Sequence, residues 1–132
     1  MTDPRRHRRW RDLVIDCDRP APLARFWAAV LQWDPPVWDE RDLRDLAAAG
    51  ISDPEDDPSV FIVEVDPTRP RICFQRVSEP KQIKNRVHLD VNVDHRSEVD
   101  DFVRLGAVVL AEHDGWIVLA DPEGNEFCAV LR

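Results

Sequence analysis

Apolar residues recur along the chain with two spacings, which predict strands and helices in alternation. A spacing of three and four follows Pro20 and predicts an amphipathic helix, because proline is tolerated in the first turn of a helix. Strict alternation in residues 87–93 predicts a half-buried strand. The pattern as a whole predicts strands at residues 10–17, 60–65, 71–77, 87–93, 107–111, 116–120 and after the turn at 121–125, and helices at 20–31, 41–49 and 97–105. Residues 32–38 are a candidate for one more short strand.

The order of these elements indicates a repeated unit, with β-α-α-β-β followed by β-α-β-β-β. In the first half Asp12 stands 14 positions before a phenylalanine of the predicted helix, and in the second half His88 does the same. Toward the other end of each half, an Asp-Pro pair precedes a cysteine, Cys73 or Cys128, by seven positions. The first half is the longer one, and its additional residues fall in an acidic segment at about 39–58.

Length and charge limit the classes of function. A chain of 132 residues with 43% hydrophobic residues can build one core, so we expect a single domain over 1–132. Within it we expect one module at residues 10–78, with the acidic insertion, and a second at 86–132. The formal net charge of −8 disfavours nucleic acid as a partner. No apolar run is long enough to span a membrane, and the N-terminus lacks the apolar region of a signal peptide, so we expect a cytoplasmic protein.

Cysteines and basic clusters leave some alternatives open. Cys17, Cys73 and Cys128 lie in apolar runs without C-x-x-C spacing, which favours reduced core residues over a disulfide framework. Five arginines crowd residues 5–11, and we interpret them as a solvated terminus, with an anion-binding arm as the alternative. The segment KQIKNR at residues 81–86 is either a solvated linker between the modules or a segment that attracts a carboxylate-bearing ligand.

The repeated unit, with a D-P-x-G-N turn before its last strand, resembles the vicinal oxygen chelate superfamily. This superfamily includes glyoxalase I, the bleomycin-resistance proteins and the extradiol dioxygenases, and the chain is most similar to the small bacterial glyoxalase-like domains. The resemblance is carried by the segments DCDRPAPLARFWAAVLQW, ICFQRVSEPKQIKNRVHLDV and DPEGNEFCAV. It implies an α+β fold of two βαβββ modules that form a pair of half-barrels around a ligand cleft. It also implies a homodimer, with the modules paired within or across chains.

The resemblance further implies where a divalent metal would bind, because metal-using members take one ligand from the first strand and one from the last strand of each module. His88 and Asp12 occupy the first-strand positions. The last-strand position of the second module falls on Cys128 instead of a glutamate, and Glu126 lies two residues earlier on the same strand face. The predicted metal set is therefore His88, Glu126 and Asp12, holding Zn, Ni, Mn or Fe, and its alternative is that no metal is held.

The candidate catalytic residues are His88 and Glu126, which would ligate a metal or transfer a proton. Their structural alternatives are a hydrogen-bonded strand histidine and a solvated glutamate, and Asp12 could simply be ion-paired at the surface. The candidate ligand-binding residues are Gln75, Asp90, Cys128 and Trp27. Because the family's metal ligands are mostly replaced, we predict a protein that binds a small molecule in the cleft without a tightly held metal. A divalent-metal-dependent lyase or dioxygenase is the alternative.

Overall fold

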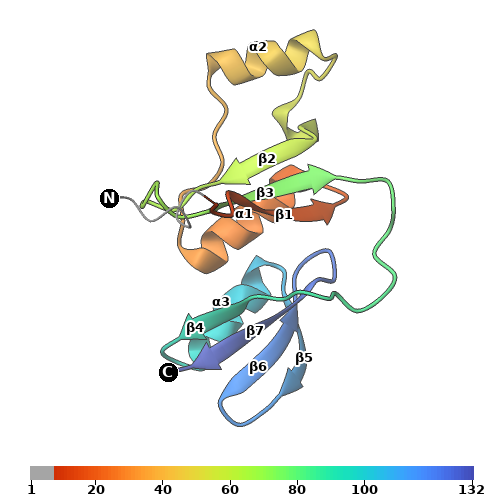
Figure 1. Ribbon diagram of the computed structural model, residues 1–132. Helices are drawn as coiled ribbons and strands as arrows, with labels where there is room; N and C mark the ends of the chain where they lie inside the picture. The colour runs from red at the N-terminus through yellow and green to blue at the C-terminus, as the bar shows by residue number, and fades with distance from the viewer. Residues whose placement is uncertain (1–7) are drawn as a thin grey trace.

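The computed structural model describes residues 8–132, so the predictions for Arg5 and Arg6 lie outside the described part of the chain. The chain has a mixed α+β fold of two modules, each built on one sheet (Figure 1). The first module consists of β1 (Asp12–Cys17), α1 (Pro20–Leu31), α2 (Glu40–Ala48), the short 3-10 helix η2 (Pro54–Asp56), β2 (Ser59–Ile62) and β3 (Arg71–Arg76). The second consists of β4 (Asp90–Val93), α3 (Ser97–Leu105), β5 (Val108–Glu112), β6 (Trp116–Ala120) and β7 (Glu126–Leu131). Within residues 8–132, no helix has the length and apolar character needed to cross a bilayer.

Strand pairing confirms the internal repeat. In each module the first strand runs parallel to the last, with Val14 opposite Cys73 in the first and Asp90 opposite Cys128 in the second. An antiparallel strand pairs with the other side of the last strand and places Phe61 opposite Cys73, as β6 pairs with β7 in the second module. Val14 and Asp90 therefore occupy equivalent positions, and so do Asp12 and His88, which lie two residues before them. The alignment of the two halves predicted from the sequence is correct.

The two modules differ at the point where a further strand was a candidate. Residues 32–38 form no strand, so the first sheet has three strands in the order β1-β3-β2 and the second has four in the order β4-β7-β6-β5. Pro35 and Pro36 lack the N–H groups that strand pairing requires. The chain continues instead into α2, which begins with a capping box between Asp39 and Asp42 and contains no buried residue. The acidic insertion therefore replaces the strand that corresponds to β5.

One continuous core joins the two modules. Helix α1 packs against β2 and β3 of the first sheet, and its residues Phe26 and Trp27 contact Phe127 of β7 edge to face. The aromatic contacts continue to Phe102 of α3. Figure 1 shows α1 between the first sheet and the second module. The helix-covered faces of the two sheets are therefore turned toward the centre of the molecule, and the other face of each sheet is turned outward.

Candidate functional site

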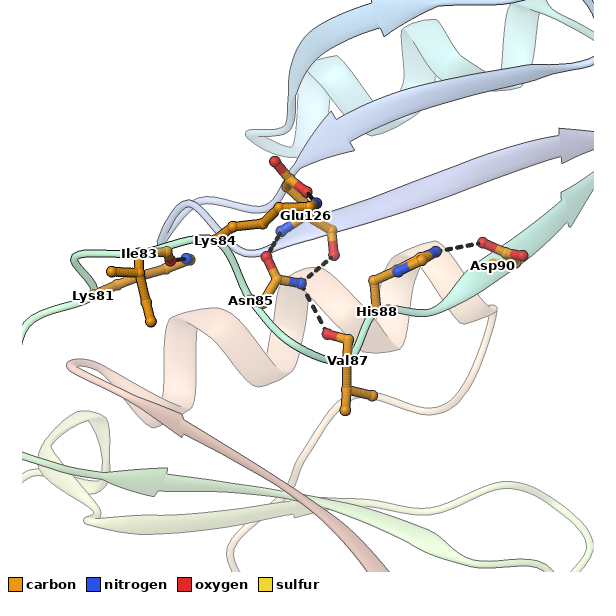
Figure 2. A network of polar contacts seen from close by, with 8 residues as sticks. All are labelled: Lys81, Ile83, Lys84, Asn85, Val87, His88, Asp90 and Glu126. Atoms are coloured by element: carbon orange, nitrogen blue, oxygen red, sulfur yellow. Dashed lines mark hydrogen bonds and ion pairs between the residues drawn. The ribbon is translucent and has the colours of Figure 1, made fainter.

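The outer face of the second sheet brings three potential metal or ligand contacts together. His88 and Asp90 are two residues apart in extended chain and point to the same face, and Cys128 lies opposite Asp90 on β7. The His88 Nε2 atom lies 3.2 Å from the Asp90 carboxylate, and their side chains are 50% and 62% exposed. Figure 2 shows this pair at the start of β4. One nitrogen, one oxygen and one sulfur of His88, Asp90 and Cys128 all lie within 4.8 Å of one another.

Cys128 is held as a neutral thiol. Burial raises the pKa of its thiol above the ordinary value, and the carboxylates of Asp90 and Glu126 raise it further. A thiol of this kind is a poor nucleophile at neutral pH, because the thiolate is the reactive species. A cation beside the sulfur would be attracted to the Asp90 carboxylate. The sequence-predicted residues His88, Asp90 and Cys128 are thus adjacent in the structure.

Glu126 begins β7 and is held by two residues of the linker between the modules (Figure 2). Its carboxylate forms an ion pair with the ammonium group of Lys84. Its backbone N–H donates to the Asn85 side chain at 2.9 Å, and its carbonyl accepts from Asn85 Nδ2 at 3.0 Å. Asn85 also donates to the carbonyl of Val87. The Asn85 side chain therefore satisfies the Glu126 backbone groups that a neighbouring strand would otherwise pair with. Strand β4 begins at Asp90, and the predicted start at residue 87 is wrong.

In the first module the matching positions carry an ion pair. The Asp12 carboxylate accepts hydrogen bonds from Arg71 at 2.9 and 3.2 Å and from Arg11 at 3.0 Å. The Arg71 bonds are the main reason that the pKa of Asp12 lies below its ordinary value. Arg71 occupies the position that corresponds to Glu126, and its guanidinium carbon lies 4.4 Å above the Phe61 ring. Within residues 8–132, the cluster of potential metal ligands around His88 includes neither Asp12 nor Glu126.

The remaining sequence candidates lie in different surroundings. Gln75 is exposed near the end of β3, where it pairs with Asp16 and Ser59 on the outer face of the first sheet. Trp27 is 2% exposed, and its indole N–H donates to the Asp121 carboxylate, so it belongs to the core and does not line a ligand cleft. The helical spacing correctly placed Trp27 on an apolar face but did not show what covers that face.

The sequence interpretation missed Asn85 and Arg71, and it considered Lys84 only as a residue that attracts a ligand. Lys84 and Asn85 lie in the segment KQIKNR, which was interpreted only as a linker or as an attractant for a carboxylate-bearing ligand. Arg71 gave no signal in the sequence, because its partner Asp12 is remote along the chain and becomes adjacent only through the parallel pairing of β1 with β3. The anionic group that Lys84 contacts is Glu126 of the same chain.

A groove of about 1020 Å³ lies where the linker passes from the first module to the second. Its walls come from the end of β1, the start of α1, the linker at residues 77–86 and the turn before β7. At one wall Glu123 accepts hydrogen bonds from the backbone N–H groups of Asp18 and Arg19, which closes the N-terminus of α1. Lys84 lines the groove and reaches Glu126, so the groove adjoins the outer face of the second module.

Comparisons with known proteins agree with this fold. The sequence model of the family described as a glyoxalase-like domain matches residues 12–130. No curated protein gives a significant match. Among solved structures, the fosfomycin resistance protein FosX from Mesorhizobium loti has a TM-score of 0.60 at 12% identity, covering 94% of this chain and 91% of its own. A glyoxalase/bleomycin resistance protein from Albidiferax ferrireducens T118 has a TM-score of 0.58 at 15% identity, covering 93% and 98%. At these identities the likeness concerns the fold alone.

Proposed function

The chain belongs to the glyoxalase-like domain family, and from this premise we propose that it binds a small organic molecule at the outer face of its second module. The observation that carries the proposal is the state of the predicted metal ligands. Glu126 is neutralised by Lys84, and Asp12 is neutralised by Arg71. A divalent cation that bound Glu126 and Asp12 would have to displace Lys84 and Arg71 from these carboxylates. This displacement costs free energy, which binding to an unpaired carboxylate would not. The predicted set of His88, Glu126 and Asp12 therefore does not fit a tightly held metal.

We propose that a second copy of the chain closes the ligand cleft. Support comes from the positions of Asp12 and His88, which correspond to each other in the two modules and lie on the outer faces of the two sheets. These faces cannot meet within one chain, because α1 lies between the sheets. Both outer faces also expose large apolar side chains, and these are Val14 and Phe61 in the first module and Leu110 and Trp116 in the second. In a homodimer, the first module of one protomer would cover the second module of its partner and bury this apolar surface.

The side chains around His88 indicate the chemistry of the ligand. Val118 and Trp116 give the face an apolar floor, while His88 and Asp90 offer a donor and an acceptor. This combination suits a compact, mainly apolar molecule with one or two oxygen substituents.

The experiment is a thermal-shift and calorimetric screen of the protein after treatment with a chelator. We expect apolar carbonyl compounds and phenols to stabilise the metal-free protein, because a ligand that binds only the folded state raises the unfolding temperature. His88→Ala should weaken that binding, whereas His95→Ala, which changes an exposed histidine next to α3, should leave it unchanged. Ligand binding that survives His88→Ala, or that appears only after a metal is restored, would contradict the proposal.

A soft divalent metal at His88, Asp90 and Cys128 is a second candidate, favoured by the proximity of these three groups. Nitrogen, oxygen and sulfur donors suit Zn²⁺, and three protein ligands would leave one position open. A metal held by this set would support the alternative of a metal-dependent lyase or dioxygenase. Elemental analysis after incubation with Zn²⁺, Ni²⁺, Mn²⁺ or Fe²⁺ tests it. Stoichiometric metal that is lost in both His88→Ala and Cys128→Ser would favour this candidate over metal-free binding.

A further inference from the structure

We propose that the first module carries a separate binding site for a small molecule in which a phosphate is attached to a planar ring. The site is a groove of about 390 Å³ between the segment that leads into β1 and the turn that joins β2 to β3. Within one protomer it lies in the other module from the proposed site at His88. The residues that line the groove are Arg9, Trp10, Arg11, Pro67, Thr68, Arg69, Pro70 and Arg71.

The two walls of the groove are fixed to each other. The backbone N–H of Arg71 donates to the Arg11 carbonyl at 3.2 Å, which ties the N-terminal segment to the start of β3. Asp12 lies behind this contact and accepts from the side chains of both Arg11 and Arg71. On the other wall, Thr68 donates its N–H and its hydroxyl to Asp66 and so holds the turn. Arg11 and Arg71 are thus held on two segments that are hydrogen-bonded to each other.

The charge of the groove is opposite to that of the whole protein. Four guanidinium groups line it in a chain whose formal net charge is −8, and since those of Arg11 and Arg71 are paired with Asp12, a ligand would be bound chiefly by Arg9 and Arg69. Arg69 lies 3.8 Å from Glu64 and 3.7 Å from Asp66, and exposed pairs at such distances are weak. Arg69 can therefore turn toward a ligand. A local concentration of arginines in an acidic protein creates a positive potential that draws in small anions.

The arginines and Trp10 together define the ligand class. Arginine binds oxyanions through paired N–H groups, and a phosphate has three terminal oxygens that can accept from several guanidinium groups at once. A carboxylate has only two oxygens and a single charge. Trp10 is 68% exposed beside these arginines, and its flat face can stack on a planar ring. An aryl phosphate or a nucleoside phosphate meets both requirements. The sequence left an anion-binding arm as one interpretation of the N-terminal arginines. The groove adds Arg69 and Arg71, from the other wall, to Arg9 and Arg11 of that cluster.

The test is a titration with phenyl phosphate, inorganic phosphate and benzoate at near-physiological ionic strength, followed by tryptophan fluorescence and calorimetry. We expect saturable binding of phenyl phosphate, weaker binding of inorganic phosphate and the weakest binding of benzoate. Arg69→Gln and Arg9→Gln should each weaken phenyl phosphate binding by about tenfold, as loss of a charge-assisted hydrogen bond does. Trp10→Phe should remove the fluorescence change. Both arginines are at the surface, so these variants should fold.

Arg104→Gln is the matched control, because Arg104 is a similarly exposed arginine of the second module that pairs with Asp101. It should bind phenyl phosphate like the unmodified protein. Equal weakening in Arg104→Gln would show that only the overall charge matters and would overturn the site. Benzoate binding as tight as that of phenyl phosphate would overturn the ligand class. Absence of saturable binding to all three probes would overturn the proposal while leaving the site at His88 untouched.

Discussion

The indole N–H of Trp27, in the first module, donates a 3.0 Å hydrogen bond to the Asp121 carboxylate, in the turn that precedes β7 of the second. Asp121 is 2% exposed and also accepts from the backbone N–H groups of Glu123 and Asn125 and from the Asn125 side chain. One carboxylate therefore shapes the D-P-E-G-N turn and joins it to α1. The turn was one of the three segments that carried the family resemblance, and the structure gives it this additional connection between modules.

We expect Asp121→Ala to destabilise the protein by about 3 kcal/mol, because it leaves buried donors of Trp27 and the turn without an acceptor. Asp121→Asn keeps one acceptor and should cost less. Urea unfolding measures both, and Trp27→Phe completes a double-mutant cycle. If the two single changes add without coupling, the hydrogen bond between the modules contributes nothing of its own.

Asn85→Ala should loosen the start of β7 without changing the rest of the second sheet. The change removes the side chain that pairs with both backbone groups of Glu126 and with the Val87 carbonyl. We expect a loss of about 1–3 kcal/mol in the free energy of unfolding. Hydrogen exchange should show faster exchange of the Glu126 amide in particular. Asn92→Ala, an exposed asparagine on β4, is the control. Unchanged exchange at Glu126 would contradict the positioning role of Asn85.

Local patterns predicted most of the fold. The helix over Ser97–Leu105 and the strand over Trp116–Ala120 have the predicted bounds, since their apolar spacing and flanking glycines are local signals. The candidate strand at residues 32–38 failed because Pro35 and Pro36 prevent strand pairing there. The internal repeat aligned β1 with β4 and β3 with β7, and the pairing of the first strand with the last in each module agrees with that alignment.

The site was less predictable, because its properties depend on pairs that are distant in sequence. His88 and Asp90 share a face by simple alternation, and this much was visible in the sequence. The neutralisation of Glu126 by Lys84 depends on the path of the linker across the second module. The pairing of Asp12 with Arg71 depends on strand register. Both ion pairs reduce the availability of the predicted metal ligands Glu126 and Asp12, and neither pair could be predicted from the sequence.

The proposed cleft predicts that outer-face substitutions change assembly. Trp116→Glu and Phe61→Glu each place a charge on an exposed apolar face, where burial against a second copy would be costly. We expect each variant to sediment as a monomer under conditions in which the unmodified protein is a dimer. Val37→Glu, at an exposed apolar residue of the segment between α1 and α2, should leave the dimer intact. A dimer that persists in both outer-face variants would mean that these faces are not the interface.

Acid should remove the contribution of the Asp12–Arg71 pair to stability. Arg71 holds the pKa of Asp12 below its ordinary value, so the folded state favours the ionised carboxylate. The resulting stability is present above the ordinary aspartate pKa of about 3.9 and is lost as the pH falls through the lower folded value. Asp12→Asn should therefore be less stable than the unmodified protein at pH values from neutral down to about 5, and the difference should shrink below about pH 4. Urea unfolding across this range measures it, with Asp101→Asn as a surface control. A difference that stays constant down to the lowest pH would show that Asp12 contributes by packing instead of by charge.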